Sequence, residues 1–252
     1  MILHRGTVIL TMMLFTVFFL LAGCESLPQS PVEEEPVETI NSVADGADPV
    51  EPAPVTLHPA EVGEDVTLTE ALMGRKSIRD YDTVPMALED LAQLLWAAQG
   101  DGTDAVATVT RTAPSAGATH PLELFVVAGA VEGLAAGVYH YQYFSQELVL
   151  QTAVDIRKEL AQAALGQDMI SRAPAVIIIA ADFQRTTQRY GSRGETYVYM
   201  ESGGVAQNIA LQAAALDIGN VVVGAFRDEE MARVLQIDPA PLLIIPVGYP
   251  VD

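Results

Sequence analysis

The sequence Ala-Val-Ile-Ile-Ile-Ala-Ala occupies residues 175–181, directly after Pro174. Seven apolar residues in a row, rich in Ile, are typical of a strand that is buried on both faces. Such a strand needs other elements packed over both sides of its sheet. We therefore expect a layered domain with this strand in its interior.

Helical and strand patterns alternate on both sides of this stretch. Short apolar runs predict the other strands, and apolar residues spaced three and four apart predict the helices. The strands are expected at 122–128, 138–141, 147–151, 220–223 and 242–247, and the helices at 87–99, 155–165, 197–216 and 228–235. This alternation predicts an α+β or α/β layered domain. Residues 185–193 carry three Arg at helical spacing, but Gly191 and Gly194 favour a loop there.

The composition excludes several classes of function. The chain has 252 residues, 33 of them acidic and 13 basic, and a formal charge of −20. Nucleic-acid binding is disfavoured, because phosphate contacts need clustered Lys and Arg. One Cys cannot build a disulfide framework or a cysteine-based zinc site. The four His residues form no His-Glu-x-x-His pattern, and no G-x-S-x-G nucleophile elbow is present, so neither a metal site nor a serine hydrolase is expected.

The first 23 residues are predicted to be a signal peptide. Arg5 precedes an apolar run of 15 residues, Val8 to Ala22, which is shorter than the ~20 residues that span a bilayer. Leu21-Ala22-Gly23-Cys24 resembles the lipobox of bacterial lipoproteins, whose Cys is acylated and becomes the mature N-terminus. We therefore expect lipidation at Cys24 and an exported protein anchored to the cell envelope, on its periplasmic or outer face. An uncleaved anchor or a buried Cys is the alternative.

Residues 24–60 are predicted to form an extended tether. Residues 25–60 hold 7 of the 15 prolines, 8 acidic residues and no Lys or Arg. Such a composition cannot bury enough apolar surface to fold, and Pro and like charges stiffen it. The folded domain is therefore expected at 61–252, where 12 basic and 25 acidic residues give a charge of −13.

A basic cluster lies near the start of this domain, in Arg-Lys-Ser-Ile-Arg-Asp-Tyr at 75–81. It follows a short helical stretch that Gly74 can end. Guanidinium groups bind phosphate oxygens bidentately, and a Ser hydroxyl adds a further donor. The cluster therefore indicates a site for one bound phosphate, with a solvated charged turn as the alternative.

Two segments of small residues stand beside predicted strands. Arg-Thr-Ala-Pro-Ser-Ala-Gly-Ala-Thr-His-Pro at 111–121 precedes the strand at 122–128 and would let a flat ligand lie against its backbone. Residues 221–226 run from a strand into Gly224 and Ala225, where backbone N–H groups can bind the polar edge of a ring. An ordinary connection between elements is the alternative for each.

Taken together and in this order, these segments resemble the nitroreductase superfamily of flavin enzymes, with the SagB/ThcOx-type dehydrogenases as the closest subgroup. The resemblance covers residues 66–250. Its further motifs are Leu-Leu-Trp-Ala-Ala-Gln-Gly at 94–100, Pro-Leu-Glu-Leu at 121–124, Glu-Ser-Gly-Gly-Val-Ala-Gln-Asn at 201–208, Gly-Ala-Phe at 224–226 and Pro-Val-Gly-Tyr-Pro at 246–250. It implies an α+β fold of three layers, in which helices flank a mixed central sheet.

The resemblance also implies noncovalent FMN, bound at the interface of a homodimer whose core contains the helix with residues 201–216. The positions that hold the FMN phosphate and ribityl chain are matched by Arg75, Ser77 and Arg79, and the adjacent Lys76 is expected to contribute to the same site. The segment along the isoalloxazine ring is matched by Pro114, Ser115, Ala116 and Gly117, and Gly224 and Ala225 match the backbone on its reactive side. In the family reaction a reduced nicotinamide gives a hydride to FMN, which then reduces an acceptor such as a quinone or nitroaromatic compound.

Three features depart from this pattern. No basic residue follows Arg233, where many members hold the phosphate near the C-terminus, so weaker FMN binding is expected. Arg189 stands where azoline oxidases have Lys, and Arg cannot act as a general base, so azole formation is disfavoured. Tyr190 beside it is kept and is the candidate for proton transfer or substrate contact. The third departure is the lipobox, because nicotinamide donors are scarce outside the cytoplasm. The lone Arg5, without a twin-Arg pair, indicates export of the unfolded chain and flavin loading afterwards.

The sequence therefore supports one leading hypothesis and two rivals. The leading hypothesis is a lipid-anchored FMN-dependent oxidoreductase that moves a hydride or electrons between a small-molecule donor and an organic acceptor. The first rival is a flavin-binding lipoprotein that carries electrons or senses flavin without turnover. The second is a scaffold that has lost FMN.

Overall fold

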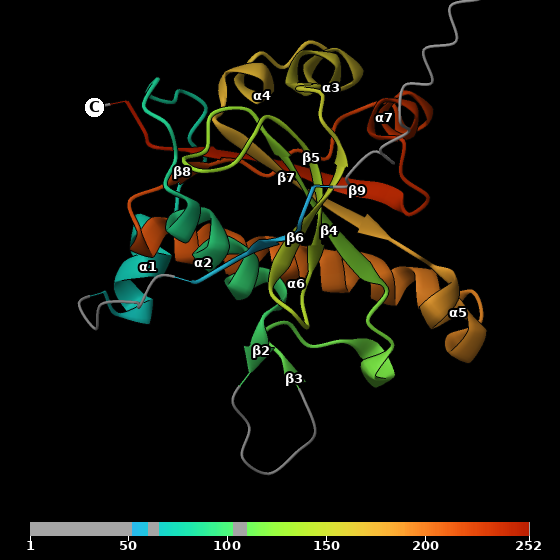
Figure 1. Cartoon of the computed structure of the whole chain (residues 1–252). Coiled ribbons are helices and arrows are strands. Elements are labelled where there is room, and N and C mark those ends of the chain that lie inside the picture. Colours follow the sequence, from blue (N-terminus) through green and yellow to red (C-terminus); the bar gives the residue numbers. More distant parts are fainter. Residues whose placement is uncertain (1–51, 60–65, 103–109, 252) are drawn as a thin grey trace, which may run out of the picture. The chain divides into compact units, whose positions relative to one another are not determined.

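A seven-stranded sheet forms the centre of the computed structural model, which describes residues 52–59, 66–102 and 110–251 (Figure 1). The strand order is β1-β6-β5-β4-β7-β9-β8. The strands are β1 Val55–Thr56, β4 Leu122–Ala128, β5 Gly137–Gln142, β6 Glu147–Thr152, β7 Ala175–Ala181, β8 Gly219–Asn220 and β9 Ala240–Gly248. Two short strands, β2 Asp101–Gly102 and β3 Thr110–Arg111, pair with each other outside this sheet.

Helices cover both faces of the sheet and complete three layers (Figure 1). One face carries α1 Leu68–Gly74, α2 Leu88–Gln99 and α6 Arg193–Ala215. The other carries α3 Arg157–Ala163, α4 Met169–Arg172 and α7 Asp228–Leu235. A short helix, α5 Gln184–Tyr190, follows β7 and leads into α6. The expected α+β fold of three layers is confirmed.

Strand β7 shows why the sheet needs two helical layers. All seven of its residues are buried, as the sequence predicted. Ile177 and Ile179 pack into the hydrophobic core that contains residues of α2 and α6, whereas Val176 and Ile178 pack into the core that contains residues of α3 and α7. Successive side chains of a strand point to opposite faces, so one apolar run supplies both cores.

The strand pairs described for this sheet are all antiparallel. Two isolated bridges of the described residues are parallel, that of Ser77 with Asn220 and that of Met86 with Val131. The expected mixed character of the sheet is therefore found only in such isolated bridges, because every pair of its named strands is antiparallel. Three elements, β4, β7 and α7, begin and end at the predicted residues, whereas the longest helix, α6, begins four residues before the predicted Tyr197.

The expected boundary between tether and domain lies too late in the chain. Val55 and Thr56, placed in the tether by composition, pair with Leu148 and Glu147 at the sheet edge. Leu57 follows them and is only 3% exposed in the core. Three residues are too few to reveal strand periodicity among prolines, which is why composition dominated the prediction.

The loop predicted at 185–193 is also wrong, because residues 184–190 form α5. Gly191, at φ +57°, separates α5 from α6. Gly194 lies inside α6. A Cβ there would approach Thr187 Cα to 2.9 Å, so this glycine allows the two helices to pack closely. Of the strand predicted at 220–223, Asn220 belongs to β8, and Val223 makes a single bridge to Ile244.

The predicted signal peptide, Cys24 and most of the tether lie outside the described residues. Within the described ranges, we find no helix that is both long and apolar enough to cross a membrane.

Candidate functional site

The basic cluster at 75–79 is held against the edge of the sheet. Arg75 ends α1, where its N–H donates to the Ala71 carbonyl at 2.9 Å. Ser77 forms the bridge to Asn220, and the Ile78 N–H donates to the Asn220 carbonyl at 2.8 Å. These backbone contacts fix the segment beside β8 and leave the predicted phosphate-binding side chains facing solvent.

The cations of this cluster are available to an anion. Arg75, Lys76 and Arg79 are exposed, and none forms an ion pair with another described residue. Lys76 lines a cavity of about 270 Å³ with Asn220 and residues at the end of α6. Three positive charges within five positions of an acidic protein form a local field that favours an anion such as a phosphate.

Tyr81 anchors the far end of this cluster. Its hydroxyl donates to the Ile78 carbonyl at 2.9 Å and lies 3.1 Å from the Pro246 carbonyl oxygen. Burial raises the pKa of the Tyr81 hydroxyl well above its usual value, and the Arg79 charge offsets this only in part. Tyr81 therefore remains a neutral hydrogen-bond donor that locks the segment in place.

Gly224 and Ala225 lie within reach of the same edge. Gly224 lies four positions after Asn220, the partner of Ser77, which limits the distance between their Cα atoms to about 14 Å. Both residues are exposed, and the Ala225 carbonyl accepts a hydrogen bond from Gln167 Nε2 at 2.9 Å. A Cβ on Gly224 would meet only Leu243 Cδ2, at 3.6 Å, so the fold itself does not require glycine there.

The segment 114–117 lies elsewhere, against the N-terminal half of α6. Pro114, Ser115 and Ala116 line a cavity of about 340 Å³ together with the α6 residues Tyr197, Met200, Glu201 and Gly204. Glu201 is 8% exposed and accepts hydrogen bonds from the Ser115 side chain and the Ala116 backbone. Burial raises the pKa of Glu201 above its usual value, although these hydrogen bonds and the Arg111 charge oppose the shift.

The backbone of this segment is strained. Gly117, Ala118 and His120 have φ values of +60°, +54° and +44°. A left-handed conformation costs a non-glycine residue about 1–2 kcal/mol, and such strain gathers at ligand-binding sites. Hydrogen bonds hold the strained segment: the His120 N–H donates to Ser115 Oγ at 2.9 Å, and Thr119 Oγ1 lies 2.8 Å from Thr186 Oγ1.

Tyr190 and Arg189 touch this segment at Gly117. Arg189 Nη1 donates to the Gly117 carbonyl at 2.9 Å. A Cβ on Gly117 would collide with the Tyr190 hydroxyl and with the Arg189 guanidinium. The structure therefore brings the predicted catalytic residue, Tyr190, to the segment predicted to lie along a flavin ring.

The two halves of the predicted site are far apart within one copy of the chain. The basic cluster lies at the C-terminal end of α6, where Lys76 and Ala214 line one cavity, and the segment 114–116 lies beside Glu201. Thirteen residues of helix separate Ala214 from Glu201, which corresponds to about 20 Å. The structure thus groups 75–79 with 224–225, and 114–117 with Tyr190, but does not join the two groups.

The sequence of the domain matches one family model over most of its length. The model described as "Nitroreductase family" matches residues 72–249. The chain belongs to the nitroreductase family. It is a nitroreductase-type flavin oxidoreductase, and members of this family typically bind FMN and form dimers.

Known relatives of this nitroreductase agree with the assignment. The MJ1384 protein of Methanocaldococcus jannaschii, named as a nitroreductase, is 44% identical over 75% of this chain and 94% of its own. The microcin B17-processing protein McbC of Escherichia coli is 29% identical over 54% of this chain, but the chain spans only 53% of McbC. A Ralstonia eutropha nitroreductase structure superposes with a TM-score of 0.68 at 26% identity, and covers 82% of this chain and 97% of its own.

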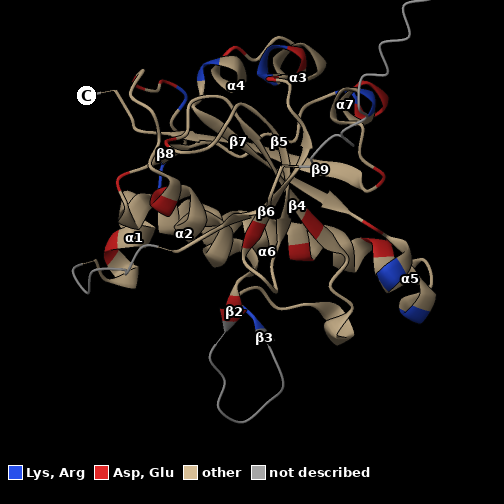
Figure 2. Cartoon of the chain, viewed as in Figure 1, with Lys and Arg blue, Asp and Glu red and all other residues tan. Residues whose placement is uncertain are grey.

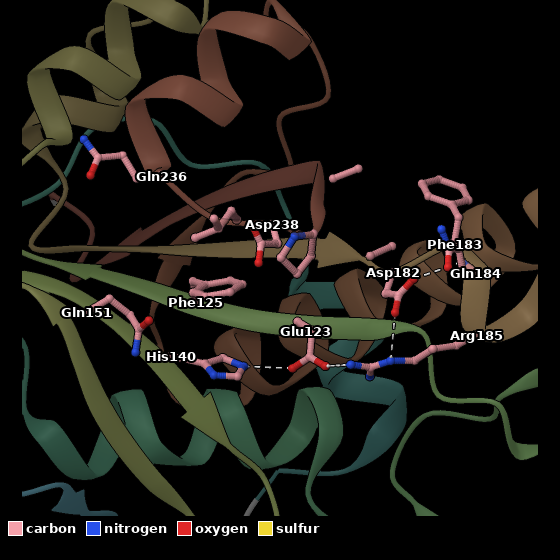
Figure 3. A pocket seen from close by; sticks show the side chains of 14 residues that line it. Glu123, Phe125, His140, Gln151, Asp182, Phe183, Gln184, Arg185, Gln236 and Asp238 are labelled. Carbon is pink, nitrogen blue, oxygen red and sulfur yellow. Dashed lines mark hydrogen bonds and ion pairs between the residues drawn. The ribbon is translucent and has the colours of Figure 1, made fainter.

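A larger cavity of the nitroreductase, about 780 Å³, contains none of the predicted site residues (Figure 3). Glu123 of β4 lies at its floor, 2.8 Å from His140 Nε2 and 2.5 Å from Arg185 Nη2. Burial alone would raise the pKa of Glu123, but the His140 hydrogen bond and the Arg185 charge hold it below its usual value. Glu123, His140, Arg185 and Asp182 are linked by ion pairs there, and they form a polar network beside the end of the sheet.

Sequence reasoning missed the role of Glu201. It quoted this residue only as part of the motif 201–208, whereas the structure shows a buried carboxylate that holds the segment 115–116. A signal was available: Val198, Glu201, Val205 and Ile209 follow helical spacing on one face, and the carboxylate is the only charged member. A charged residue on a buried stripe needs a partner, and the preceding small-residue segment supplies it.

Proposed function

We propose that the protein is an FMN-dependent oxidoreductase whose cofactor site forms between two copies of the chain. The observation that carries this proposal is the separation of about 20 Å along α6 between two segments that suit different parts of one flavin. Two copies related by a two-fold axis can bring the basic cluster of one to the segment 114–117 of the other. Each dimer would then hold two identical sites.

The residues at both segments fit FMN. Its phosphate would be held by the unpaired cations Arg75, Lys76 and Arg79, with the Ser77 hydroxyl as a further donor. The ring would lie along Pro114, Ser115, Ala116 and Gly117, whose lack of bulk leaves their backbone open, and beside the exposed backbone of Gly224 and Ala225. When bound, FMN supplies the capacity to take a hydride from a reduced donor and pass electrons to an organic acceptor.

Exposed apolar side chains on the same side of the sheet suit a second copy. Leu68, Leu72 and Met73 of α1 are 68%, 53% and 82% exposed, and Tyr199 and Met200 of α6 are 57% and 61% exposed. Leu68 lines a cavity of about 310 Å³ with the C-terminal part of α6, and Met200 lines the cavity of about 340 Å³ beside its N-terminal half. An apolar surface of this extent is typical of a subunit interface.

Within this reaction class, Tyr190 is the proposed proton donor or substrate contact, since its hydroxyl lies at Gly117. Azole formation is not proposed, because Arg189 beside it stays charged and cannot serve as a base. The rival hypothesis, in which the protein carries electrons or senses flavin without turnover, has the same flavin-binding site. Only catalysis separates the two hypotheses.

The experiment loads the full chain, in detergent, with FMN, removes free flavin, and records the absorbance spectrum and quinone reduction by a reduced nicotinamide. Retained flavin with turnover supports the oxidoreductase, whereas retained flavin without turnover favours the carrier. Arg75→Ala/Arg79→Ala should lose the flavin. The matched control, Lys158→Ala/Arg233→Ala on α3 and α7, removes two exposed cations elsewhere and should retain it. A folded chain that retains no flavin would favour the scaffold and overturn the proposal.

We also propose that Cys24 carries the lipid that anchors this enzyme to the cell envelope. The support is the sequence Leu21-Ala22-Gly23-Cys24 after an apolar signal, in a chain with no other Cys. Buried acyl chains contribute about 0.8 kcal/mol per CH₂, so two or more hold firmly. Cys24→Ser should move the protein from the membrane fraction to the soluble one and abolish the lipid mass on the N-terminal peptide. Unchanged membrane association would contradict this anchor.

A further inference from the structure

An arginine-rich segment of this acidic domain lies next to the segment 114–117. Residues 184–194 contain three Arg and no Asp or Glu, and they form α5 and the start of α6 (Figure 2). Arg185 is occupied, because it pairs with Glu123 at 2.5 Å and with Asp182 at 3.4 Å. Arg189 and Arg193 are exposed and form no ion pair with any residue in the described ranges.

Two tyrosines hold these free guanidinium groups in position. Arg189 Cζ lies 5.4 Å from the ring centroid of Tyr190, and Arg193 Cζ lies 5.4 Å from that of Tyr197. The two rings contact each other edge to face, with centroids 5.2 Å apart at 86°. Cation–π contacts of this kind restrain a guanidinium without using all its N–H groups. We call these four residues the arginine–tyrosine edge.

The arginine–tyrosine edge borders the place where a flat ligand would lie. Arg189 and Tyr190 touch Gly117, and Tyr197 lines the cavity of about 340 Å³ with Pro114, Ser115 and Ala116. Two acidic residues lie near this edge on α6. Glu195 is exposed, and Glu201 is buried and hydrogen-bonded to Ser115 and Ala116. Arg189, bound to the Gly117 carbonyl, and Arg193, beside the Tyr197 ring, therefore add positive charge next to residues of this cavity, in addition to the charge of Arg111 that acts on Glu201.

We propose that the arginine–tyrosine edge recognises an anionic group, a carboxylate, sulfonate or phosphate, on the planar redox partner that lies at 114–117. This inference rests on the proposed function and adds the charge of its substrate. A domain of net charge −13 repels anions at long range, so an anionic partner needs local guanidinium groups, whereas a neutral quinone needs none. Donor and acceptor of a ping-pong reaction occupy this place in turn, so either one could carry the anion.

The first test compares acceptors. The FMN-loaded full chain is assayed with N-benzyl-1,4-dihydronicotinamide, a neutral donor, and with 1,4-naphthoquinone or its 2-sulfonate. Arg193→Gln should lower the ratio of kcat/KM for the sulfonate to that for the neutral quinone roughly threefold to fivefold, since an exposed charge pair contributes only modestly. Arg193→Lys should restore most of the ratio. Arg233→Gln on α7 removes one exposed charge from the far face and should leave the ratio unchanged.

The second test compares donors, with 1,4-naphthoquinone as the fixed acceptor. The anionic donor is reduced nicotinamide adenine dinucleotide phosphate, and the neutral donor is N-benzyl-1,4-dihydronicotinamide. If the anion belongs to the donor, Arg193→Gln lowers the ratio of kcat/KM for the anionic donor to kcat/KM for the neutral one. In either test the effect should shrink as salt rises from 20 mM to 300 mM, because exposed charges are screened. Equal ratios for Arg193→Gln and Arg233→Gln in both tests would overturn the inference.

A third readout does not need flavin. Binding of anthraquinone-2-sulfonate to the flavin-free chain is followed by quenching of protein fluorescence, with neutral 2-(hydroxymethyl)anthraquinone as the reference. Arg193→Gln should weaken only the binding of the sulfonate, by a similar factor of roughly three to five, and should leave the binding of the neutral compound unchanged. If the chain retains no FMN but Arg193→Gln still weakens binding of the sulfonate, the result contradicts the proposed function and supports anion binding by the arginine–tyrosine edge. Equal binding of the sulfonate to Arg193→Gln and Arg233→Gln would contradict anion recognition by the arginine–tyrosine edge.

Discussion

The Tyr190 hydroxyl fills the space that a Cβ on Gly117 would occupy. Tyr190 is the last residue of α5, directly before the break between α5 and α6, and Gly117 lies in the strained segment before β4. Because Gly117 has φ +60° and no side chain, the backbone and the phenol can meet directly. This contact joins the predicted ring-binding segment to the predicted proton donor.

Gly117→Ala should therefore destabilise the chain and weaken flavin retention. The left-handed conformation costs an alanine about 1–2 kcal/mol, and displacement of Tyr190 and Arg189 adds to that cost. Urea unfolding and flavin content measure the two effects. Gly166→Ala is the matched control, because Gly166 has φ +77° with open space around it. Gly166→Ala should lose only the stability that the left-handed backbone costs an alanine, and it should keep its flavin. Equal flavin loss in both variants would contradict a role for the contact of Gly117 with Tyr190.

Tyr190→Phe keeps the ring and removes only the hydroxyl. If the hydroxyl transfers a proton to or from the substrate, kcat should fall by about 100-fold while flavin content and the unfolding midpoint stay close to wild type. Stopped-flow reduction and reoxidation show which half-reaction is slowed. Tyr139→Phe, which removes a hydroxyl that donates to the Ala135 carbonyl and belongs to neither half of the proposed site, should not change either rate. Full activity of Tyr190→Phe would leave Tyr190 as a packing residue.

Glu201 should make stability fall as pH rises. Its folded pKa lies above 4.5, the usual value of a Glu side chain, so above pH 4.5 the folded state binds more protons than the unfolded state. The stability that protonated Glu201 contributes is therefore fully present below pH 4.5 and is lost as the pH rises through its folded pKa. Glu201→Gln removes this dependence, so the difference in unfolding free energy between wild type and variant should change with pH between 4 and 8. A difference that does not vary with pH would contradict the raised pKa.

Glu123 should behave in the opposite way. Its folded pKa lies below 4.5, so its contribution is present above pH 4.5 and is lost as pH falls through the folded value. At pH 7, Glu123→Gln should cost about 1–2 kcal/mol, since it weakens hydrogen bonds to Arg185 and His140. The cost should fall as the pH is lowered through the folded pKa of Glu123. Glu230→Gln, which breaks the exposed pair with Arg227, should cost less than about 1 kcal/mol at any pH, and an equal cost for both would refute the distinction.

Apolar periodicity predicted most of the fold because long elements carry their pattern locally. β4, β7 and α7 each contain seven or eight residues whose burial follows from sequence spacing alone. β1 could not be found this way, because only two residues pair and the stabilising burial of Leu57 comes from the rest of the sheet. In α5, Gly191 and Gly194 indicated a loop, although one ends a helix and the other allows two helices to pack.

The candidate site was predictable as segments but not as an arrangement. Residue chemistry indicated the anion-binding cluster, and its unpaired cations agree with that interpretation. The contact of Gly117 with Tyr190 and that of Ser115 with Glu201 join residues far apart in the chain, so no local pattern could reveal them. The separation of the two segments along α6 likewise required the packed structure.

The most direct test of the shared site uses a chain that lacks one half of it and a chain that lacks the other. Arg75→Ala/Arg79→Ala and Gly117→Ala chains with different affinity tags are co-expressed, and the mixed dimer is isolated through both tags. In a two-fold dimer with a site between copies, one site is intact and the other carries both defects. We predict about half the flavin per chain of the wild type in the mixed dimer, and little flavin in either variant alone. A mixed dimer without flavin, from chains that fold and pair, would contradict the site between copies.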